Sequence, residues 1–103
     1  MGPRIEQRYG ANRRKTRVAA TLVADGFDIP AVIVDCSARG VKLKLACPVA
    51  PGTAVRLAFL EAEENAIVHW WRAGHAGLRF LDRLDRDTLF TLETAADELA
   101  EWR

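Results

Sequence analysis

Cysteine and histidine are scarce in this chain. Its 103 residues include two of each, Cys36, Cys47, His69 and His75. Two cysteines outside C-x-x-C spacing form neither a disulfide framework nor a zinc site, and we expect both thiols to stay reduced. Neither histidine has an acid or a cysteine at the spacing of a metal-ligand set. The sequence therefore predicts no metal site and no secreted disulfide scaffold.

Long apolar runs are also missing. No stretch approaches the length of a membrane span, and the N-terminus lacks the apolar core of a signal peptide. Glu6 stands where a myristoylation signal requires serine or threonine. We therefore expect a cytoplasmic protein without a membrane span.

Patterns of catalytic residues are absent as well. Cys36 and Ser37 have no histidine near them in the sequence, and no glycine-rich phosphate loop precedes a helical segment. No pair of carboxylates is spaced for acid-base chemistry. The sequence thus predicts a protein that is not an enzyme and that uses no cofactor.

The composition fits one small globular domain with opposite charges at its two ends. Half of the residues are hydrophobic, 28% are charged, and the net charge is +1. Residues 1–20 hold six basic residues and one acid, whereas residues 82–103 hold seven acids and three arginines. A basic segment attracts anions, but the remainder is not basic enough for an extended nucleic acid, so a compact dianion fits better. The plain alternative is a solvated basic tail.

Alternating apolar residues predict a mainly β protein. Val18–Ala24 and Phe27–Cys36 flank the hairpin dipeptide Asp25-Gly26, and Pro30 indicates a bulge or an edge in the second strand. Val41–Leu45 alternates apolar residues with two lysines, which predicts one buried face. Further strands are predicted at 55–59, 66–72 and 77–81, with an exposed acidic turn at 61–65. Short strands separated by turn residues favour a closed antiparallel barrel.

The last segment changes to a helical period. Asp85 is a suitable N-cap, and Asp87 suits the positive end of the helix dipole. Acidic residues occupy most of the other positions, which gives an amphipathic helix. The apolar stripe consists of Leu89, Leu92, Ala96, Leu99 and Trp102. We expect this stripe to close one end of the barrel or, in part, to meet another protein.

Two short motifs flank the first predicted hairpin. Arg13 and Arg17 frame an R-x-x-x-R segment, and Asp35, Ser37 and Gly40 form a D-x-S-x-x-G turn between two strands. Each motif alone is common, because basic clusters and Asp/Ser turns recur in many proteins. Together, in this order and at this separation, they resemble the two-part ligand signature of PilZ domains, and the resemblance covers about residues 12–100.

The resemblance implies a fold, a ligand and a site. The fold is a small closed antiparallel β-barrel, six-stranded and Greek-key-like, with a C-terminal α-helix. The barrel would span about 17–82 and the helix about 86–102, within a domain at 12–103 that follows a flexible basic arm at 1–11. The ligand is the bacterial second messenger cyclic di-GMP. The implied binding residues are Arg13, Arg14, Arg17, Asp35, Ser37 and Gly40.

These residue types suit a ligand with two guanines on a ring that contains two phosphodiesters. A guanidinium bridges phosphate oxygens, pairs with guanine O6 and N7, or stacks on a base. Asp35 is able to accept hydrogen bonds from guanine N1 and N2, and Ser37 offers a hydroxyl and a backbone N–H. Gly40 permits a positive φ or a close backbone approach. Arg39 lies at a variable position of the turn and is not assigned to the site.

The layout also predicts a mechanism. We expect the segment through Arg17 to be held by few apolar contacts and to be mobile in the free protein. Arg13 and Arg17 would close over the ligand, while Asp35 and Ser37 hold its other side. The newly ordered surface would then be recognised by a downstream effector protein.

Several alternatives stay open. Some PilZ domains lack a ligand site and act only as protein-protein adaptors. A small barrel with Trp70 or Trp71 as a stacking platform also suits single-stranded nucleic acid. These tryptophans alternate along one strand, so one is expected to pack inward and the other to be partly exposed. Asn12 stands where relatives often have a basic or apolar residue, which leaves the binding of one ligand or of an intercalated pair undecided. The sequence also leaves a monomer and a homodimer open.

Overall fold

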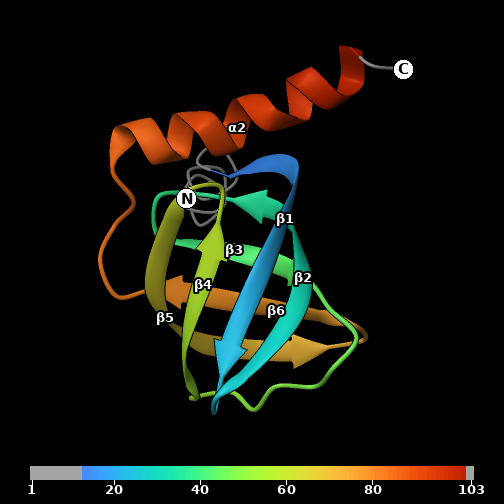
Figure 1. The fold of residues 1–103 in the computed structure, drawn as a ribbon, viewed down its shortest axis with the longest axis vertical. Helices are drawn as coiled ribbons and strands as arrows, with labels where there is room; N and C mark the ends of the chain where they lie inside the picture. The colour runs from blue at the N-terminus through green and yellow to red at the C-terminus, as the bar shows by residue number, and fades with distance from the viewer. Residues whose placement is uncertain (1–12, 102–103) are drawn as a thin grey trace, which may run out of the picture.

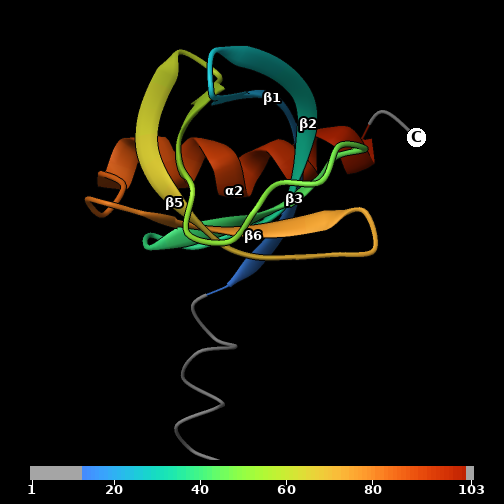
Figure 2. The same cartoon turned by 90° about the horizontal axis from the view of Figure 1, so that it is seen from below.

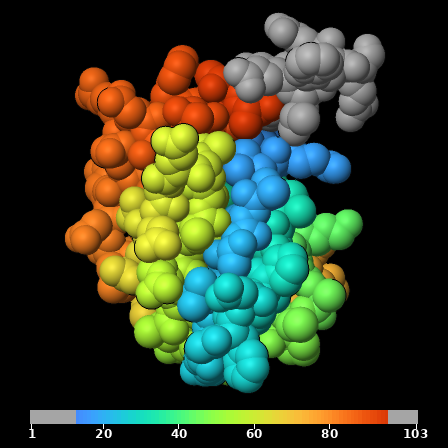
Figure 3. All heavy atoms as spheres, in the orientation of Figure 1, coloured from blue at the N-terminus to red at the C-terminus, as the bar shows by residue number. Residues whose placement is uncertain are grey.

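The computed structural model describes residues 13–101, with side chains through Ala95. Its elements are β1 (Arg14–Ala24), β2 (Phe27–Cys36), β3 (Gly40–Lys44), β4 (Ala54–Phe59), β5 (Ala62–Arg72), β6 (His75–Phe80) and α2 (Arg86–Glu101). The six strands form a closed antiparallel barrel in the order β1-β2-β3-β6-β5-β4, and α2 lies across one end (Figure 1). β1 and β4 pair where the barrel closes, and their side chains touch in Figure 3. The predicted fold class is confirmed.

Strand β1 begins three residues before the expected start of the barrel, at Arg14. Lys15 already pairs with Asp35 of β2. Thr16 is only 7% exposed, and its hydroxyl donates a hydrogen bond to a carbonyl of α2. The expectation of a loosely held segment through Arg17 is therefore wrong for residues 14–17, because strand pairing and a buried hydrogen bond hold them. The expected arm at 1–11 lies outside the described residues.

The first hairpin and its proline follow the sequence prediction. Asp25 and Gly26 form the turn with positive φ angles of 51° and 81°, as a two-residue hairpin requires. Pro30 pairs with Thr21 of β1, whereas the pairing of β2 with β3 begins at Val32. The proline thus lies on an open edge of β2, where its missing N–H costs no ladder hydrogen bond.

Inward side chains from every strand fill the barrel. Leu22, Ile33, Leu43, Leu57 and Val68 are each at most 1% exposed, and each comes from a different strand. The lysines that alternate with the apolar residues of β3 stay outside the core, so the predicted register of this strand is confirmed. Successive side chains of a strand point to opposite faces, which is why alternation in the sequence predicts this interior.

Strand β5 is longer than the sequence indicates. The segment 61–65, expected to be an exposed turn, contributes residues 62–65 to β5, where Glu64 pairs with Leu57 of β4. The turn before it is tight, and Leu60 adopts a positive φ of 53° there. The prediction failed because charged residues also occupy the outer face of a strand, so charge alone does not indicate a loop.

Helix α2 covers one end of the barrel, as Figures 1 and 2 show. Asp85 is its N-cap, as predicted: Asp85 Oδ1 accepts a hydrogen bond from the Thr88 N–H at 2.7 Å, which lowers the pKa of Asp85. Leu92 is fully buried, and its carbonyl accepts a 2.6 Å hydrogen bond from the Thr16 hydroxyl. Leu89 packs against the core from the same side. Apolar packing and one buried hydrogen bond thus fix α2 on β1.

The remaining predicted members of the apolar stripe, Ala96, Leu99 and Trp102, lie outside the described side chains. Cys36 is buried, Cys47 is exposed, and both thiols are free. Within residues 13–101, no three potential metal ligands are grouped. Over the same range, no helix has the length and apolar content needed to cross a membrane.

Candidate functional site

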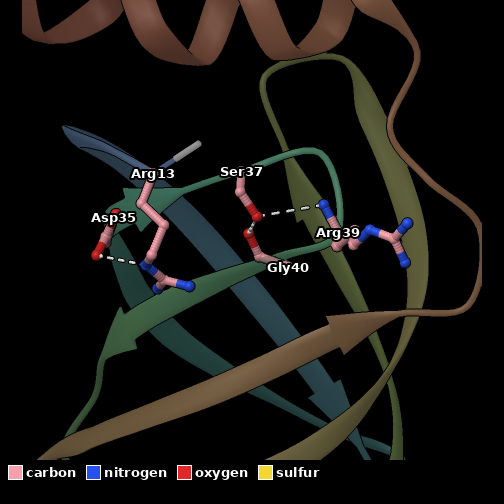
Figure 4. Close-up of polar contacts among 5 residues, drawn as sticks. All are labelled: Arg13, Asp35, Ser37, Arg39 and Gly40. Atoms are coloured by element: carbon pink, nitrogen blue, oxygen red, sulfur yellow. Dashed lines mark hydrogen bonds and ion pairs between the residues drawn. The ribbon is translucent and has the colours of Figure 1, made fainter. Parts of the chain in front are cut away.

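The two motifs meet at the end of the barrel that faces α2. Arg13 immediately precedes β1, and its Nε lies 3.1 Å from Oδ2 of Asp35 on β2 (Figure 4). Both pairings of β2 shift register at this level, between Lys15 and Val18 of β1 and between Ile33 and Asp35 of β2. Bulges of this kind re-aim side chains near strand ends. The irregular register therefore accompanies the contact between the motifs.

Ser37 holds the turn between β2 and β3 together. Its hydroxyl accepts a hydrogen bond from the Arg39 N–H at 3.2 Å and lies 3.4 Å from the Gly40 carbonyl oxygen, to which it donates (Figure 4). The Ser37 N–H donates to the same carbonyl at 2.9 Å. Serine hydroxyls commonly bond the backbone in this way. The serine of the motif therefore has a structural role in the turn.

Backbone hydrogen bonds from a distant segment fix this turn from the other side. The Phe80 N–H donates to the Arg39 carbonyl, and the Leu84 N–H donates to the Ala38 carbonyl, both at 2.8 Å. The turn is thus hydrogen-bonded to the end of β6 and to the segment that follows it. Its shape depends on tertiary contacts as well as on its own side chains.

Gly40 is required by close packing of strands. Its φ is not among the positive values in the described chain, so of the two roles predicted for it only close approach applies. A Cβ at this position would collide with the Leu78 carbonyl oxygen and would lie 3.4 Å from the Arg79 Cα. The backbone that approaches Gly40 therefore belongs to β6, and the glycine allows β3 to sit against it.

A cleft of about 640 Å³ opens beside the turn. Four of the six predicted site residues line it, namely Arg13, Arg14, Ser37 and Gly40. Arg17 does not line it and is exposed on β1, and Asp35 contacts the cleft residues through its ion pair with Arg13. The rest of the lining is Ala38, Arg39, Val41, His69, Trp70, Gly77, Leu78, Arg79, Arg83, Leu89 and Glu93.

The cleft is strongly basic. Five arginines and one carboxylate, Glu93 of α2, are among its lining residues. Only Arg13 of the five forms an ion pair with a residue that the structure describes, and its partner is Asp35. Asp35 Oδ1 is buried and accepts no hydrogen bond within the described chain. Uncompensated guanidinium groups together with an unsatisfied acceptor are the groups that an anion bearing N–H donors would satisfy.

Trp70 is the tryptophan that faces the cleft. Its indole lies over Gly77 of β6, where an added Cβ would lie 2.5 Å from the ring atom Cε2. Trp71 packs against the hydrophobic core instead. Both rings are half-buried, and the expectation that one packs inward while the other is partly exposed agrees with Trp71 on the core and Trp70 at the cleft. A register shift between Val68 and Trp70 interrupts the regular alternation of β5.

Arg39, Arg79 and Arg83 are cleft residues that sequence reasoning missed. Arg39 was excluded because its position in the turn is variable. Arg79 and Arg83 belong to β6 and to the segment after it, about forty residues from the D-x-S-x-x-G motif. A single sequence contains no signal that joins them to the turn, because only the pairing of β3 with β6 brings them together.

Cys36 lies directly beneath the site. It is completely buried at the end of β2. Burial raises the pKa of its thiol to about 11, and the nearby Glu93 and Asp35 carboxylates act in the same direction. A thiol in this environment stays protonated and behaves as a small core side chain. No nucleophilic role follows from its place in the motif.

Comparison with known proteins gives a family and a fold. The model of the PilZ domain matches residues 6–96. A comparison with curated protein sequences gave no match. Among solved structures, the chain is similar to the inhibitor of motility MotI/DgrA of Bacillus subtilis, with a TM-score of 0.63 and 17% identity over 88% of this chain and 51% of that one.

Two further structures have the same architecture. The PilZ domain of CeSA from a cellulose-synthesizing bacterium has a TM-score of 0.61 and 14% identity, over 85% of this chain and 97% of that one. The PlzA protein of Borreliella burgdorferi, solved in complex with c-di-GMP, has a TM-score of 0.60 and 15% identity, over 92% of this chain and 46% of that one. The chain therefore spans about half the length of MotI/DgrA and of PlzA.

Proposed function

The chain belongs to the PilZ domain family, and on this premise we propose that it is a cyclic di-GMP receptor that signals to a downstream protein. The family is non-enzymatic, and binding of this dinucleotide is typical of it. The observation that carries the proposal is the meeting of both motifs at one arginine-rich cleft. A receptor for a bacterial second messenger acts in the cytoplasm, which is where we propose that this protein works.

The arginines of the first motif supply the positive charge in this proposal. Arg13 and Arg14 line the cleft, and their guanidinium groups bind phosphodiester oxygens or guanine O6 and N7. Arg17, which is exposed on β1 outside the cleft lining, contacts the ligand from its outer edge. The resemblance of the R-x-x-x-R segment supports this role for Arg17. Because Arg17 does not line the cleft, its role rests on the resemblance and is tested by a binding measurement.

Asp35 recognises a guanine in the proposed complex. One of its oxygens is paired with Arg13, and the other is buried without a hydrogen-bond donor among the described residues. The N1 and N2 groups of guanine are two adjacent donors that a carboxylate accepts together. The exposed Arg13 guanidinium is thereby released from Asp35 toward a phosphate. Exchange of an internal ion pair for ligand contacts lets the site bind without leaving a buried charge unpaired.

Ser37 and Gly40 contribute to binding mainly by shaping the turn. The Ser37 hydroxyl and N–H are engaged with backbone atoms of the turn, so its ligand contact uses the remaining lone pair of the hydroxyl. Gly40 keeps β3 close to β6. The half-buried Trp70 ring lies in the cleft, where it offers a stacking surface to a guanine.

A ligand-independent adaptor is the second candidate, because several polar groups of the site already have internal partners. Arg13 is paired with Asp35, and Ser37 is satisfied within the turn. An adaptor would keep these contacts permanently and would present the same surface to a protein partner. The two functions differ in one measurable respect, since only the receptor binds cyclic di-GMP.

Isothermal titration calorimetry with cyclic di-GMP tests the proposal. We expect saturable binding by the wild-type chain and none with single-stranded DNA at matched salt. Arg13→Ala and Arg17→Ala should each weaken cyclic di-GMP binding by roughly 10- to 150-fold, which corresponds to about 1.5–3 kcal/mol for a hydrogen bond to a charged group. Arg72→Ala is the matched control, because Arg72 is exposed and does not line the cleft.

The results separate the candidates. Absence of binding by the wild-type chain contradicts the receptor and leaves the adaptor. Unaltered affinity in Arg13→Ala contradicts the site, and unaltered affinity in Arg17→Ala alone removes only that residue from it. Circular dichroism of each variant checks that the fold is retained, as expected for residues at exposed positions.

A further inference from the structure

A second group of arginines lines the cleft outside the predicted site. Arg39 lies in the turn, Arg79 on β6 and Arg83 in the segment after β6. All three are exposed, and none forms an ion pair with a residue in the described part of the chain. Taking the proposed function as given, we propose that these residues, the arginine wall, bind the second phosphodiester of the cyclic dinucleotide, which the motif arginines do not reach.

The arginine wall is assembled by the backbone of the barrel. Arg79 stands directly opposite Gly40 in the pairing of β6 with β3. The Arg39 carbonyl accepts a hydrogen bond from Phe80, the residue after Arg79, at 2.8 Å. A matching 2.8 Å bond joins Ala38 to Leu84, the residue after Arg83. Each wall arginine is therefore attached at or next to a hydrogen-bonded junction between the turn and the chain around β6, so the relative positions of their backbones are set before any ligand binds.

The motif residues that line the cleft supply little net positive charge. Within the cleft region, Arg13 is neutralised by Asp35, so Arg14 leaves one uncompensated positive charge against the two negative charges of cyclic di-GMP. The arginine wall adds three positive charges, and Glu93 subtracts one. Like charges that line one cleft repel in the free protein, and a bound dianion reduces that repulsion. The wall thus gives the cleft an excess of positive charge over the two negative charges of the ligand.

The shape of the ligand favours a second cluster of cations. The two phosphodiesters of a cyclic dinucleotide lie on opposite sides of its ring, so a single cluster of side chains contacts only one of them. Arg13 and Arg39 lie at opposite ends of the turn in Figure 4. Arginine is the residue type that binds phosphate with two parallel hydrogen bonds. Two clusters separated by the turn therefore fit the two phosphates of one ring.

The acids next to the arginine wall form no ion pair with it among the described residues. Burial raises the pKa of Glu64 on β5, and the carboxylates of Asp85 and Asp82 raise it further. Asp82 and Asp85 flank Arg83 in the sequence, yet no ion pair joins them to an arginine of the wall in the described chain. The wall thus keeps its charge available to an anion in the cleft.

Calorimetry of charge-preserving and charge-removing variants tests the arginine wall. We expect Arg79→Gln and Arg83→Gln each to weaken cyclic di-GMP binding about tenfold, as loss of one charge-assisted contact predicts. The dependence of affinity on salt concentration should become shallower in both, because fewer charges meet the ligand. Arg79→Lys should retain the salt dependence of the wild type but lose affinity, because an ammonium does not form the paired contact. Arg72→Gln removes the same charge outside the cleft and should leave binding unchanged.

The outcomes distinguish this inference from the proposed function. If the wild-type chain binds cyclic di-GMP and the wall variants bind equally well, the arginine wall is refuted and the receptor stands. If Arg72→Gln weakens binding as much as Arg79→Gln does, general charge rather than a specific contact is responsible, which also refutes the wall. A wild-type chain that does not bind refutes both proposals. Because all the substituted residues are exposed, thermal unfolding should be unchanged and serves as the control.

Discussion

Two turns of this barrel use the same residue types to different ends. The turn between β1 and β2 consists of Asp25 and Gly26, both with positive φ, and nothing lies within 4 Å of a Cβ added to Gly26. The motif from Asp35 to Gly40 contains the turn between β2 and β3, which needs no positive φ. Its backbone is bonded to β6 and to the segment that follows. The first turn is a local structure, whereas the second is built by contacts from distant parts of the chain.

The difference shows how a common turn motif becomes a candidate binding site. In the first hairpin, the positive φ angles of Asp25 and Gly26 are the whole requirement. In the second turn, the glycine is needed for strand packing, the serine ties the turn, and the aspartate meets an arginine from another element. Because distant segments hold the backbone of this turn, its polar groups keep fixed positions beside a basic cleft. A ligand site requires that kind of preorganisation.

The largest difference between the turns should appear when each glycine receives a methyl group. Gly40→Ala should destabilise the fold by about 3 kcal/mol, because the Cβ would collide with a backbone carbonyl of β6. Gly26→Ala should cost about 1 kcal/mol, which is the strain of a positive φ in an open turn. Urea denaturation measures both. Equal losses in the two variants would contradict the distinction between a packed turn and a local one.

The pH dependence of stability should reveal that the hydrophobic core lies directly beneath the turn between β2 and β3. The Cys36 thiol has its pKa raised by burial to about 11, from an ordinary value of 9.0. Between these values the unfolded chain has lost this proton and the folded chain retains it. Stability should therefore fall as pH rises through this window, by roughly 2–3 kcal/mol, and be fully present below it.

Two cysteine variants isolate this contribution. Cys36→Val removes the thiol while keeping an apolar side chain of similar size, so its stability should decline less between pH 9 and 11 than that of the wild type. Cys47→Val changes the exposed thiol of the chain and should leave the decline as it is. Urea unfolding at several pH values makes the comparison, and parallel curves for all three proteins would rule out the proposed linkage.

The smallest effect on stability should come from substitution of Asp25 or Asp35. The two variants should instead differ in their affinity for cyclic di-GMP. Asp35→Asn should change stability by about 0.5 kcal/mol or less, because its partner Arg13 is 43% exposed. Affinity for cyclic di-GMP should fall about tenfold or more, since an amide accepts guanine donors less well than a carboxylate. Asp25→Asn keeps a residue that tolerates positive φ and should leave the affinity unchanged. An equal response of the two variants in calorimetry would argue against a specific role for Asp35.

Much of the barrel was predictable because its signals are local. The alternation of Val41–Leu45, the Asp25-Gly26 hairpin and the N-cap at Asp85 each depend on a few consecutive residues, and all three occur as predicted. The acidic stretch at 61–65 was misassigned because charge marks exposure and not the absence of a strand. The orientation of Trp70 was not predictable either, because a register shift in β5 precedes it.

The residues of the candidate site also divide into those that local sequence signals indicate and those that only the tertiary structure brings together. The sequence indicated the two motifs, and their meeting through Arg13 and Asp35 follows from the pairing of β1 with β2 that the hairpin already implied. It assigned Arg17 to the site, yet that side chain lies outside the cleft lining. It did not indicate Arg79 or Arg83, because strand order around a closed barrel is not a local property.

By itself, the sequence determined the elements of this protein, its family and the chemistry of the two motifs, since residue type and spacing act through neighbouring residues. Only the tertiary structure decided which side chains share a cleft, why Gly40 has to be glycine, and that arginines from β6 and beyond stand beside the turn. The physical reason is that closing the barrel places β6 next to β3. Residues far apart in the chain then share one electrostatic environment, in which their charges and unsatisfied hydrogen-bonding groups act together.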